Sequence, residues 1–328
     1  NDKFSGSIDY FHEQRNGIYM VRSYLPQIIG LNHITTKPYA NVGSVLSEGF
    51  DGNIAYKQRI GEVDLTVRAN MTYSKNEIKE YDEENSRYPY KMKYGFRVDQ
   101  ARGLIAEGLF KDYEEIRNRP SQGSGIMPGD IKYKDVNGDG VINGDDEVPI
   151  GATTRPNLIY GFGVSAQWKG FDINVVFQGA ANRFVYRPID NWTVPFRSNY
   201  TNTSTASLGN TWSENNRDAY YAPYTNESNI NNYNYQASSL TAQDGRYLRL
   251  KNVTIGYTFP AKLLNKTKVI SGARIYLTGA DLWETTKIKD GWDPEASARD
   301  TNNTTQAAKG VKRYPFTRNF TIGANLTF

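Results

Sequence analysis

The residues best suited to chemistry lie in one acidic segment that runs from Asp135 to Asp146. Oxygen-bearing side chains stand at its first, third, fifth and twelfth positions, and a glycine stands at the sixth, where a sharp turn is needed. This spacing is typical of a loop that binds calcium through oxygen ligands. The expected ligands are Asp135, Asn137, Asp139, Val141 (through its backbone carbonyl) and Asp146.

The same segment departs from a helix–loop–helix calcium motif. Such motifs end in a bidentate Glu, whereas this one ends in Asp146 and is soon followed by Pro149. We therefore expect an isolated calcium loop whose ion is structural and pins a long loop. The alternative is a cluster of Asn-Gly and Asp-Gly turns that needs no metal.

Aromatic residues form a second candidate site, because the faces of Tyr and Trp can stack on sugar rings or peptide side chains. They crowd the segment between residues 180 and 246. The alternative is that they pack loops against one another. The candidate ligand-binding residues are Trp192, Trp212, Tyr220, Tyr221, Tyr224, Tyr233 and Tyr235.

The sequence contains few of the residues on which catalytic sites usually depend. The chain has no cysteine and two histidines, His12 and His33, which disfavours thiolate sites, multi-histidine zinc sites and His-based triads. Adjacent acids such as Glu114-Glu115 are usually just solvated, and sequence does not show the separation that a glycosidase pair needs. We expect no catalytic residues and no enzyme activity. The net charge of +4 is weak for 328 residues and argues against a nucleic-acid partner.

The elements that must position these loops are strands. Between Val63 and Tyr73, apolar and polar residues alternate strictly, and the same pattern runs through Leu158–Trp168 and on from Phe171 after a Lys169-Gly170 turn. Long alternation with aromatic residues near the ends is what a strand with lipid on one side and water on the other should look like. We predict an all-β chain of about eight strands, near 4–12, 50–58, 63–74, 158–168, 171–178, 247–259, 273–282 and 320–328. The sixth changes phase at Lys251-Asn252, which predicts a β-bulge.

The connections between these strands alternate in length. Short links are predicted around 59–62, 169–170 and 260–272, whereas the two longest connections, 75–156 and 180–246, each contain some 60 to 80 residues. Outer-membrane barrels have short turns on the periplasmic side and long loops outside. We therefore expect a transmembrane antiparallel β-barrel in which 75–156 (with the calcium-type motif) and 180–246 (rich in Tyr and Asn) are extracellular loops. A secreted β-sandwich or jelly roll is the alternative, although its turns are usually short at both ends.

Several segments together resemble one family. They are Gly108-Leu-Phe110 with Glu114-Glu-Ile116, Pro128 to Gly140, Tyr160-Gly-Phe162, Trp168 to Asp172, Tyr247 to Tyr257, Gly291-Trp-Asp-Pro-Glu295, Tyr314-Pro315 and the last strand ending in Phe328. In order and spacing they are similar to the C-terminal part of SusC-like (SusC/RagA) TonB-dependent outer-membrane transporters of Bacteroidetes-type bacteria. The resemblance spans nearly the whole chain.

This resemblance implies more than the residues do. It implies that residues 1–328 supply the C-terminal strands of a barrel of about 22 strands, that the plug domain and TonB box lie elsewhere in a longer polypeptide, and that Phe328 is the barrel assembly signal. It further implies TonB-dependent import of oligosaccharides or peptides, a SusD-like surface lipoprotein as a lid, contact with outer-membrane lipid, and a possible dimer of transporter–lipoprotein pairs. The alternative is a surface glycan-binding protein that does not transport.

Overall fold

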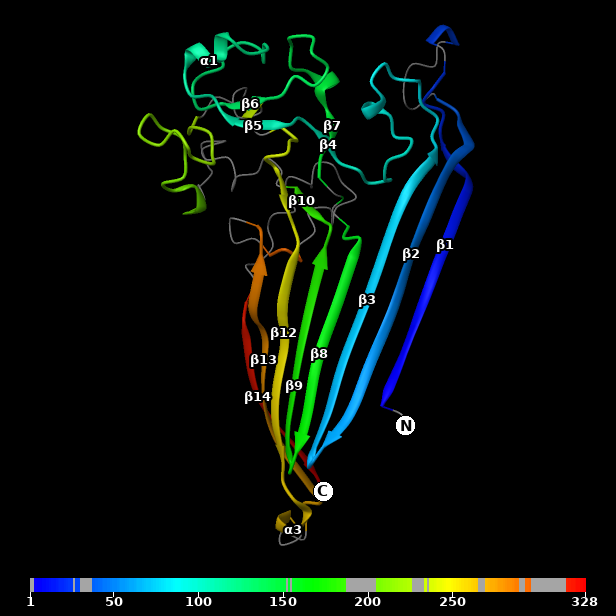
Figure 1. The fold of residues 1–328 in the computed structure, drawn as a ribbon, viewed down its shortest axis with the longest axis vertical. Helices are drawn as coiled ribbons and strands as arrows, with labels where there is room; N and C mark the ends of the chain where they lie inside the picture. Colours follow the sequence, from blue (N-terminus) through cyan, green and yellow to red (C-terminus); the bar gives the residue numbers. More distant parts are fainter. Residues whose placement is uncertain are drawn as a thin grey trace.

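The computed structural model describes residues 3–25, 27–29, 37–151, 153, 155–186, 205–225, 233–234, 236–264, 269–288, 293–295 and 317–328. Its main element is one antiparallel sheet of eight strands, in the order β1-β2-β3-β8-β9-β12-β13-β14 (Figure 1). The strands are β1 (Phe4–Val21), β2 (Tyr39–Ile60), β3 (Val63–Glu80), β8 (Leu158–Trp168), β9 (Phe171–Ala181), β12 (Tyr247–Thr258), β13 (Gly272–Thr286) and β14 (Asn319–Thr327). The expected all-β class is therefore confirmed.

The registers give the sheet one apolar and one polar face. Val67 of β3 lies opposite Val164 of β8, which lies opposite Val175 of β9. The neighbouring row pairs Thr66, Ser165 and Asn174 in the same way. Because successive side chains point to opposite faces of a strand, each alternating sequence keeps its apolar set on one side across the whole sheet.

Five strands are longer than predicted, β1, β2 and β3 by the most, and the predicted strand limits there were wrong. β1 continues to Val21, β2 begins at Tyr39, and β3 continues to Glu80, so the loop expected from residue 75 begins after 80. The extensions carry polar residues on both faces, which hides them from a search for alternation. They are held by cross-strand pairs, such as Lys75 Nζ with Glu48 Oε1 at 2.9 Å.

The predicted bulge in the sixth strand is confirmed. The register of β12 shifts between Leu250 and Asn252 against both of its neighbours, β9 and β13. At the same level Asp281 of β13 has φ +56°, a left-handed conformation that favours such irregularities. The bulge keeps Leu248 and Val253 on the same face.

The two long connections fold together at one end of the sheet. We call the described residues of 101–150 and 205–245 the loop domain (Figure 1). It contains the short pairs β4–β7 (Arg102–Gly103, Val148–Pro149) and β5–β6 (Ala106–Leu109, Ile131–Tyr133), helix α1 (Tyr113–Arg117) and strand β11 (Ala242–Asp244), which pairs with β10 (Phe184–Tyr186). Leu104, Ile131, Tyr133 and Ala222 form its core. Short helical turns lie at Gln27–Ile29, Pro89–Lys91, Gly144–Asp146, Thr205–Ser207 and, at the other end of the sheet, Ala261–Leu264 (α3).

Within the described ranges, no helix has the length and apolar content to cross a membrane.

Candidate functional site

The apolar face of the sheet carries a band bounded by aromatic rows. The row beside the short turns contains Trp168, Phe171 and Tyr257, with the Phe171 and Tyr257 ring centroids 4.5 Å apart. The opposite row contains Phe50 and Tyr73, at 5.5 Å. From Phe50 to Ile60 the strand rises about 33 Å, or about 25 Å along the barrel axis for a tilt of about 40°. That is the height of the lipid-facing band of an outer-membrane barrel.

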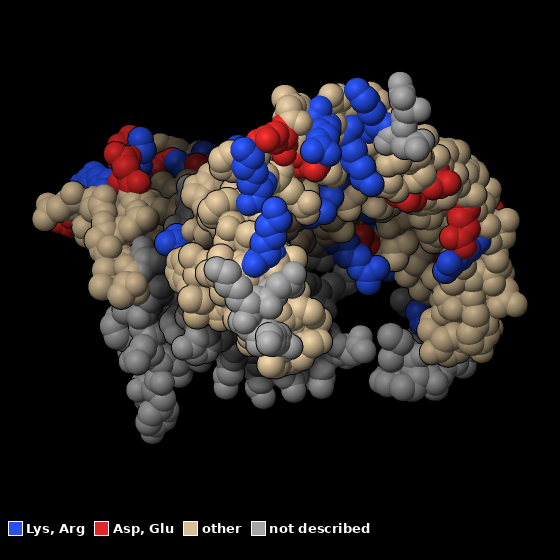
Figure 2. Space-filling view, turned by 90° about the horizontal axis from the view of Figure 1, so that it is seen from below, with Lys and Arg blue, Asp and Glu red and all other residues tan. Residues whose placement is uncertain are grey.

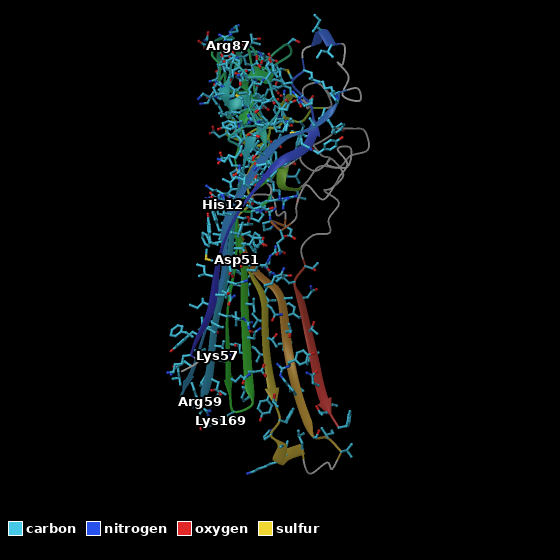
Figure 3. All side chains as sticks on the ribbon, turned by 90° about the vertical axis from the view of Figure 1, so that its right-hand side faces the viewer. His12, Asp51, Lys57, Arg59, Arg87 and Lys169 are labelled. Atoms are coloured by element: carbon cyan, nitrogen blue, oxygen red, sulfur yellow. The ribbon has the colours of Figure 1, made fainter. Side chains whose placement is uncertain are left out.

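A charged row lies immediately above this band. His12, Glu48 and Lys75 occupy facing positions on β1, β2 and β3. His12 Nδ1 lies 3.7 Å from Glu48 Oε2, and Lys75 binds the other oxygen. Figure 3 shows the level of His12 well above Lys57, Arg59 and Lys169. Because charged groups avoid hydrocarbon, this row marks the limit of the apolar band.

The polar face is lined by amides, hydroxyls and charged groups. Asn53 Nδ2 donates to Ser7 Oγ at 2.7 Å, and the hydroxyls of Thr254 and Thr278 are 3.1 Å apart. Arg274 Nη2 lies 2.6 Å from Asp172 Oδ2. Such a surface suits a hydrated solute, because it offers hydrogen-bond donors and acceptors across several strands.

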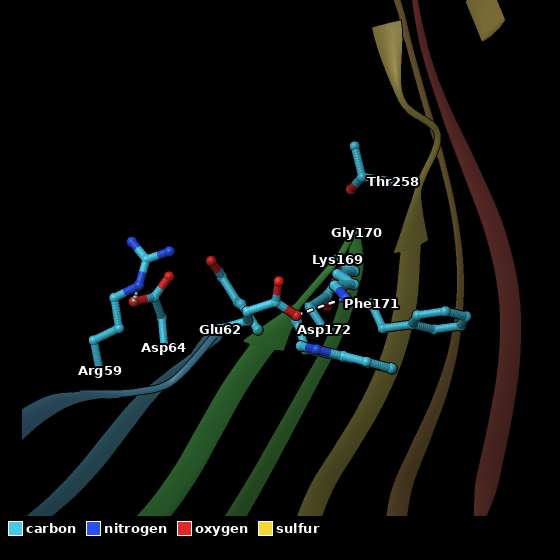
Figure 4. Close-up of a pocket in the computed structure, with 10 residues that line it drawn as sticks. Arg59, Glu62, Asp64, Lys169, Gly170, Phe171, Asp172 and Thr258 are labelled. Atoms are coloured by element: carbon cyan, nitrogen blue, oxygen red, sulfur yellow. Dashed lines mark ion pairs between the residues drawn. The ribbon is translucent and has the colours of Figure 1, made fainter. Parts of the chain in front are cut away.

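A pocket of about 480 Å³ lies at the short-turn end of the sheet (Figure 4). Arg59 and Asp64 pair across it at 3.8 Å, and Lys169 pairs with Glu62 at 2.6 Å. Viewed from that end, lysine and arginine side chains gather over the sheet (Figure 2). Its charges neutralise one another, so the pocket itself presents no free ionic site.

A buried ionic network lies higher on the polar face, around Arg249 of β12, whose side chain is 0% exposed. Its guanidinium donates to Glu284 of β13, to Asp293 Oδ1 at 2.6 Å and to Glu295 Oε2 at 2.5 Å. Lys251 Nζ adds a contact of 3.0 Å to Glu295. The network ties residues 293–295 to the wall. Sequence analysis missed it, although an Arg in an otherwise apolar strand segment was a signal for it.

The acidic segment folds as a chain of tight turns. Asp135 accepts hydrogen bonds from the backbone N–H groups of Gly138 and Gly140, at 2.6 and 2.8 Å. Asp139 Oδ1 accepts from Val141 N at 2.8 Å, and Asn137 Oδ1 accepts from Asp139 N at 2.9 Å. Asp146 is fully buried and accepts from the N–H groups of Val136 and Asn143. In the part of the chain that the structure describes, no three His, Cys, Asp or Glu side chains are grouped as a metal site. Calcium stays a prediction.

The aromatic candidates are brought into the loop domain. Tyr220 and Tyr221 pack edge to face at 5.0 Å, and Tyr233 packs edge to face on Tyr133 at 5.6 Å. Burial raises the pKa of the Tyr233 hydroxyl above its ordinary value. Tyr224 is 39% exposed. Trp212 packs over Gly129. Trp192 and Tyr235 lie outside the described residues.

A buried carboxyl joins the two halves of the loop domain, and no motif in the sequence pointed to its role. Asp130 is 1% exposed; it accepts from Asn234 Nδ2 and from Met127 N, both at 2.8 Å. Asn234 Oδ1 in turn accepts from Ile131 N at 2.8 Å. Burial raises the pKa of the Asp130 carboxyl, and the two donors offset part of that rise.

The proposed assembly signal, Phe328, directly follows β14 and is 78% exposed. It continues the apolar row of Ile322 and Leu326 on that strand, both of which are exposed. Its role in assembly stays a prediction.

Comparison with known proteins identifies relatives of this chain. No family model matches the chain. It is 28% identical over 341 residues to the TonB-dependent receptor P3 of Formosa agariphila, covering 98% of this chain and 32% of that protein. It is 24% identical over 342 residues to the TonB-dependent receptor SusC of Bacteroides thetaiotaomicron, covering 100% of this chain and 30% of that protein.

The solved structure of the RagAB peptide transporter matches the fold. The TM-score is 0.70 at 22% identity, covering 99% of this chain and 33% of that chain. The chain thus spans about a third of the length of the relatives it matches. The predicted relationship is confirmed: the chain is related over nearly its whole length to SusC-like TonB-dependent receptors, is an outer-membrane protein of the Bacteroidetes type, and contributes a partial, C-terminal set of strands to a barrel of that kind.

Proposed function

We propose that this chain forms part of the wall and of the extracellular face of a TonB-dependent importer of oligosaccharides or peptides. The observation that carries the proposal is the two-faced sheet, with an apolar band of lipid-spanning height on one side and amides, hydroxyls and ions on the other. Transport without catalysis agrees with the names of the relatives, which are receptors and a peptide transporter.

In this proposal the polar face lines the lumen, and the loop domain lies outside the cell. The short turns Gly61-Glu62 and Lys169-Gly170 then face the periplasm, as short barrel turns do. A SusD-like lipoprotein would cover the loop domain, and TonB would act through another part of the polypeptide. The relation to SusC and to the RagAB transporter supports such a lipoprotein partner. A dimer of such pairs belongs to the same proposal.

Two smaller assignments accompany it. We propose that the Asp135–Asp146 loop binds calcium to stiffen the loop domain; its support is the ligand spacing and the left-handed Gly138 and Gly140, at φ +76° and +84°, which fold the acids back over the loop. Among the aromatic candidates, Tyr224 is the best placed for ligand contact, because it is the most exposed of those described.

The experiment is uptake of labelled oligosaccharides and peptides by cells that carry or lack the gene, with and without TonB. Uptake that needs both the gene and TonB supports import. Cell-surface binding of a glycan that persists without TonB, with no uptake, would instead support the alternative of a surface glycan-binding protein.

A further inference from the structure

Two cations on the polar face stand out because no carboxylate among the described residues pairs with them. They are Lys57 of β2 and Arg68 of β3, both exposed. Lys57 lies opposite Thr66, two residues from Arg68, so the two cations are diagonal neighbours on one face, about 7–8 Å apart along the backbone positions. We call them the cationic pair.

The other arginines of this face have acidic partners within the described strands. Arg15 pairs with Glu13, Arg59 with Asp64, and Arg274 with Asp172, while Arg249 has several carboxylates. Asp64 also lies diagonally from Lys57, but its ion pair is with Arg59. The cationic pair therefore keeps its charge available to a solute.

The Arg68 guanidinium is held in a fixed position. Gly163 of β8 lies directly opposite Arg68, and a Cβ at Gly163 would be 3.4 Å from Arg68 Nε, so the side chain crosses β8 over the glycine. Gly163 is buried beneath it. Arg68 Nη2 then donates to Asn174 Oδ1 of β9 at 2.9 Å. One edge of the guanidinium is thus anchored, and no group in the described part of the chain accepts from its remaining donors.

We propose that the cationic pair is a binding site for a carboxylate group of the imported solute. An arginine whose fork is already oriented binds a planar carboxylate through two hydrogen bonds, and loses less side-chain freedom on binding. Lys57 adds a second positive charge beside it. The inference rests on the proposed import function and narrows its substrate class to carboxylate-bearing oligosaccharides or peptides.

The test is equilibrium binding to the complete purified receptor at low ionic strength. The probes are tetragalacturonate with its neutral methyl ester, and a hexa-alanine peptide with its C-terminal amide. We expect the wild-type receptor to bind one acid at least about tenfold more tightly than its neutral form, as a charge-assisted contact provides. Arg68→Gln with Lys57→Gln should remove that preference and leave binding of the neutral form unchanged. Asn174→Ala, which keeps both charges, should reduce it only in part.

Arg15→Gln is the matched control, because it removes a paired cation from the same face. If the wild type binds the acid and neutral forms equally, this inference is overturned while the proposed import function still stands. That result is expected if an acidic side chain of the same polypeptide occupies the cationic pair. Equal loss of both forms in the double variant, or the same loss in Arg15→Gln, also overturns it. If no probe binds in either form, the proposed function falls with it.

Discussion

Replacing Arg249 by Met tests the energetics of the wall most directly. Removing one partner of a buried ion pair costs about 3–5 kcal/mol, because the remaining charge stays buried without compensation. The carboxylates of Glu284, Asp293 and Glu295 are 20%, 28% and 28% exposed, so water relieves part of that cost. Lys251 also remains beside Glu295. We therefore expect Arg249→Met to lower the free energy of unfolding by about 2–3 kcal/mol.

The assay is urea unfolding of the complete receptor in lipid vesicles, followed by tryptophan fluorescence. The matched control is Arg274→Met, which breaks one pair whose side chains are 28% and 22% exposed. It should cost much less than Arg249→Met, because water screens this pair and no further carboxylate is left buried. If the two variants lose the same stability, the network around Arg249 has no special energetic role and the reasoning is refuted.

Three further predictions concern the loop domain. Gly129→Ala should destabilise the loop domain by about 2–3 kcal/mol, because Gly129 has φ +93° and a Cβ there would lie 2.5 Å from Trp212. Gly123→Ala is the control: Gly123 has φ +106° and no atom within 4 Å of the new Cβ, so this variant should cost only the backbone strain. Equal losses of stability in chemical unfolding would contradict the prediction. Burial raises the pKa of Asp130 in the folded state, so the protonated carboxyl stabilises the folded loop domain fully below the unfolded pKa, near 3.8, and this stabilisation is lost as pH rises through the folded pKa. Hydrogen exchange of loop-domain amides, corrected for intrinsic rates, should therefore be slower at pH 4 than at pH 7. Equal corrected rates at the two pH values would count against this prediction. Added calcium should raise the melting temperature of the receptor and protect the loop from proteolysis, and Asp135→Asn should abolish both effects; a wild type that does not respond removes the metal assignment.

The strands inside the apolar band could be predicted because one physical rule governs them. Lipid on one side and water on the other force a period of two residues, and a shift by one residue would invert every side chain. Val63–Tyr73 follows that rule without interruption, and Leu158–Trp168 departs from it only at Ile159. The bulge at Lys251-Asn252 was visible for the same reason, since it is the point where the period breaks.

Outside the band the rule no longer applies, and prediction failed there. The upper parts of β1 to β3 carry polar residues on both faces, so residues such as His12 and Glu13 follow no period. Their pairing depends on backbone hydrogen bonds and cross-strand contacts between residues that are tens of positions apart in the sequence. A search for alternation therefore stops near residues 12, 50 and 74.

The loop domain depends on contacts that a single sequence does not reveal. Asp130 and Asn234 are 104 positions apart, yet they share a hydrogen bond in the core. The two long connections were expected as extracellular loops, the first with a calcium-type motif and the second with aromatic residues for which packing between loops was the alternative to ligand contact. In the structure Tyr133 of the first connection joins the two, because its ring packs on Tyr233 and its hydroxyl donates to the carbonyl of Asn234. Tyr220 instead bonds within the second connection, to the carbonyl of Leu240.

The hydrogen bonds between this domain and the sheet determine how it can move. Above Tyr73, strand β3 leaves β8, and Ile78 instead exchanges backbone hydrogen bonds at 2.8–2.9 Å with Gly95 and Phe96, which belong to the segment that leads into the loop domain. On the other side, β10–β11 continues the β9–β12 pairing upward. Each such bond contributes about 0.5–1.5 kcal/mol, and swinging the domain away would break several at once without replacement. We therefore expect the loop domain to move together with the sheet, because separating the two would break these hydrogen bonds at the same time.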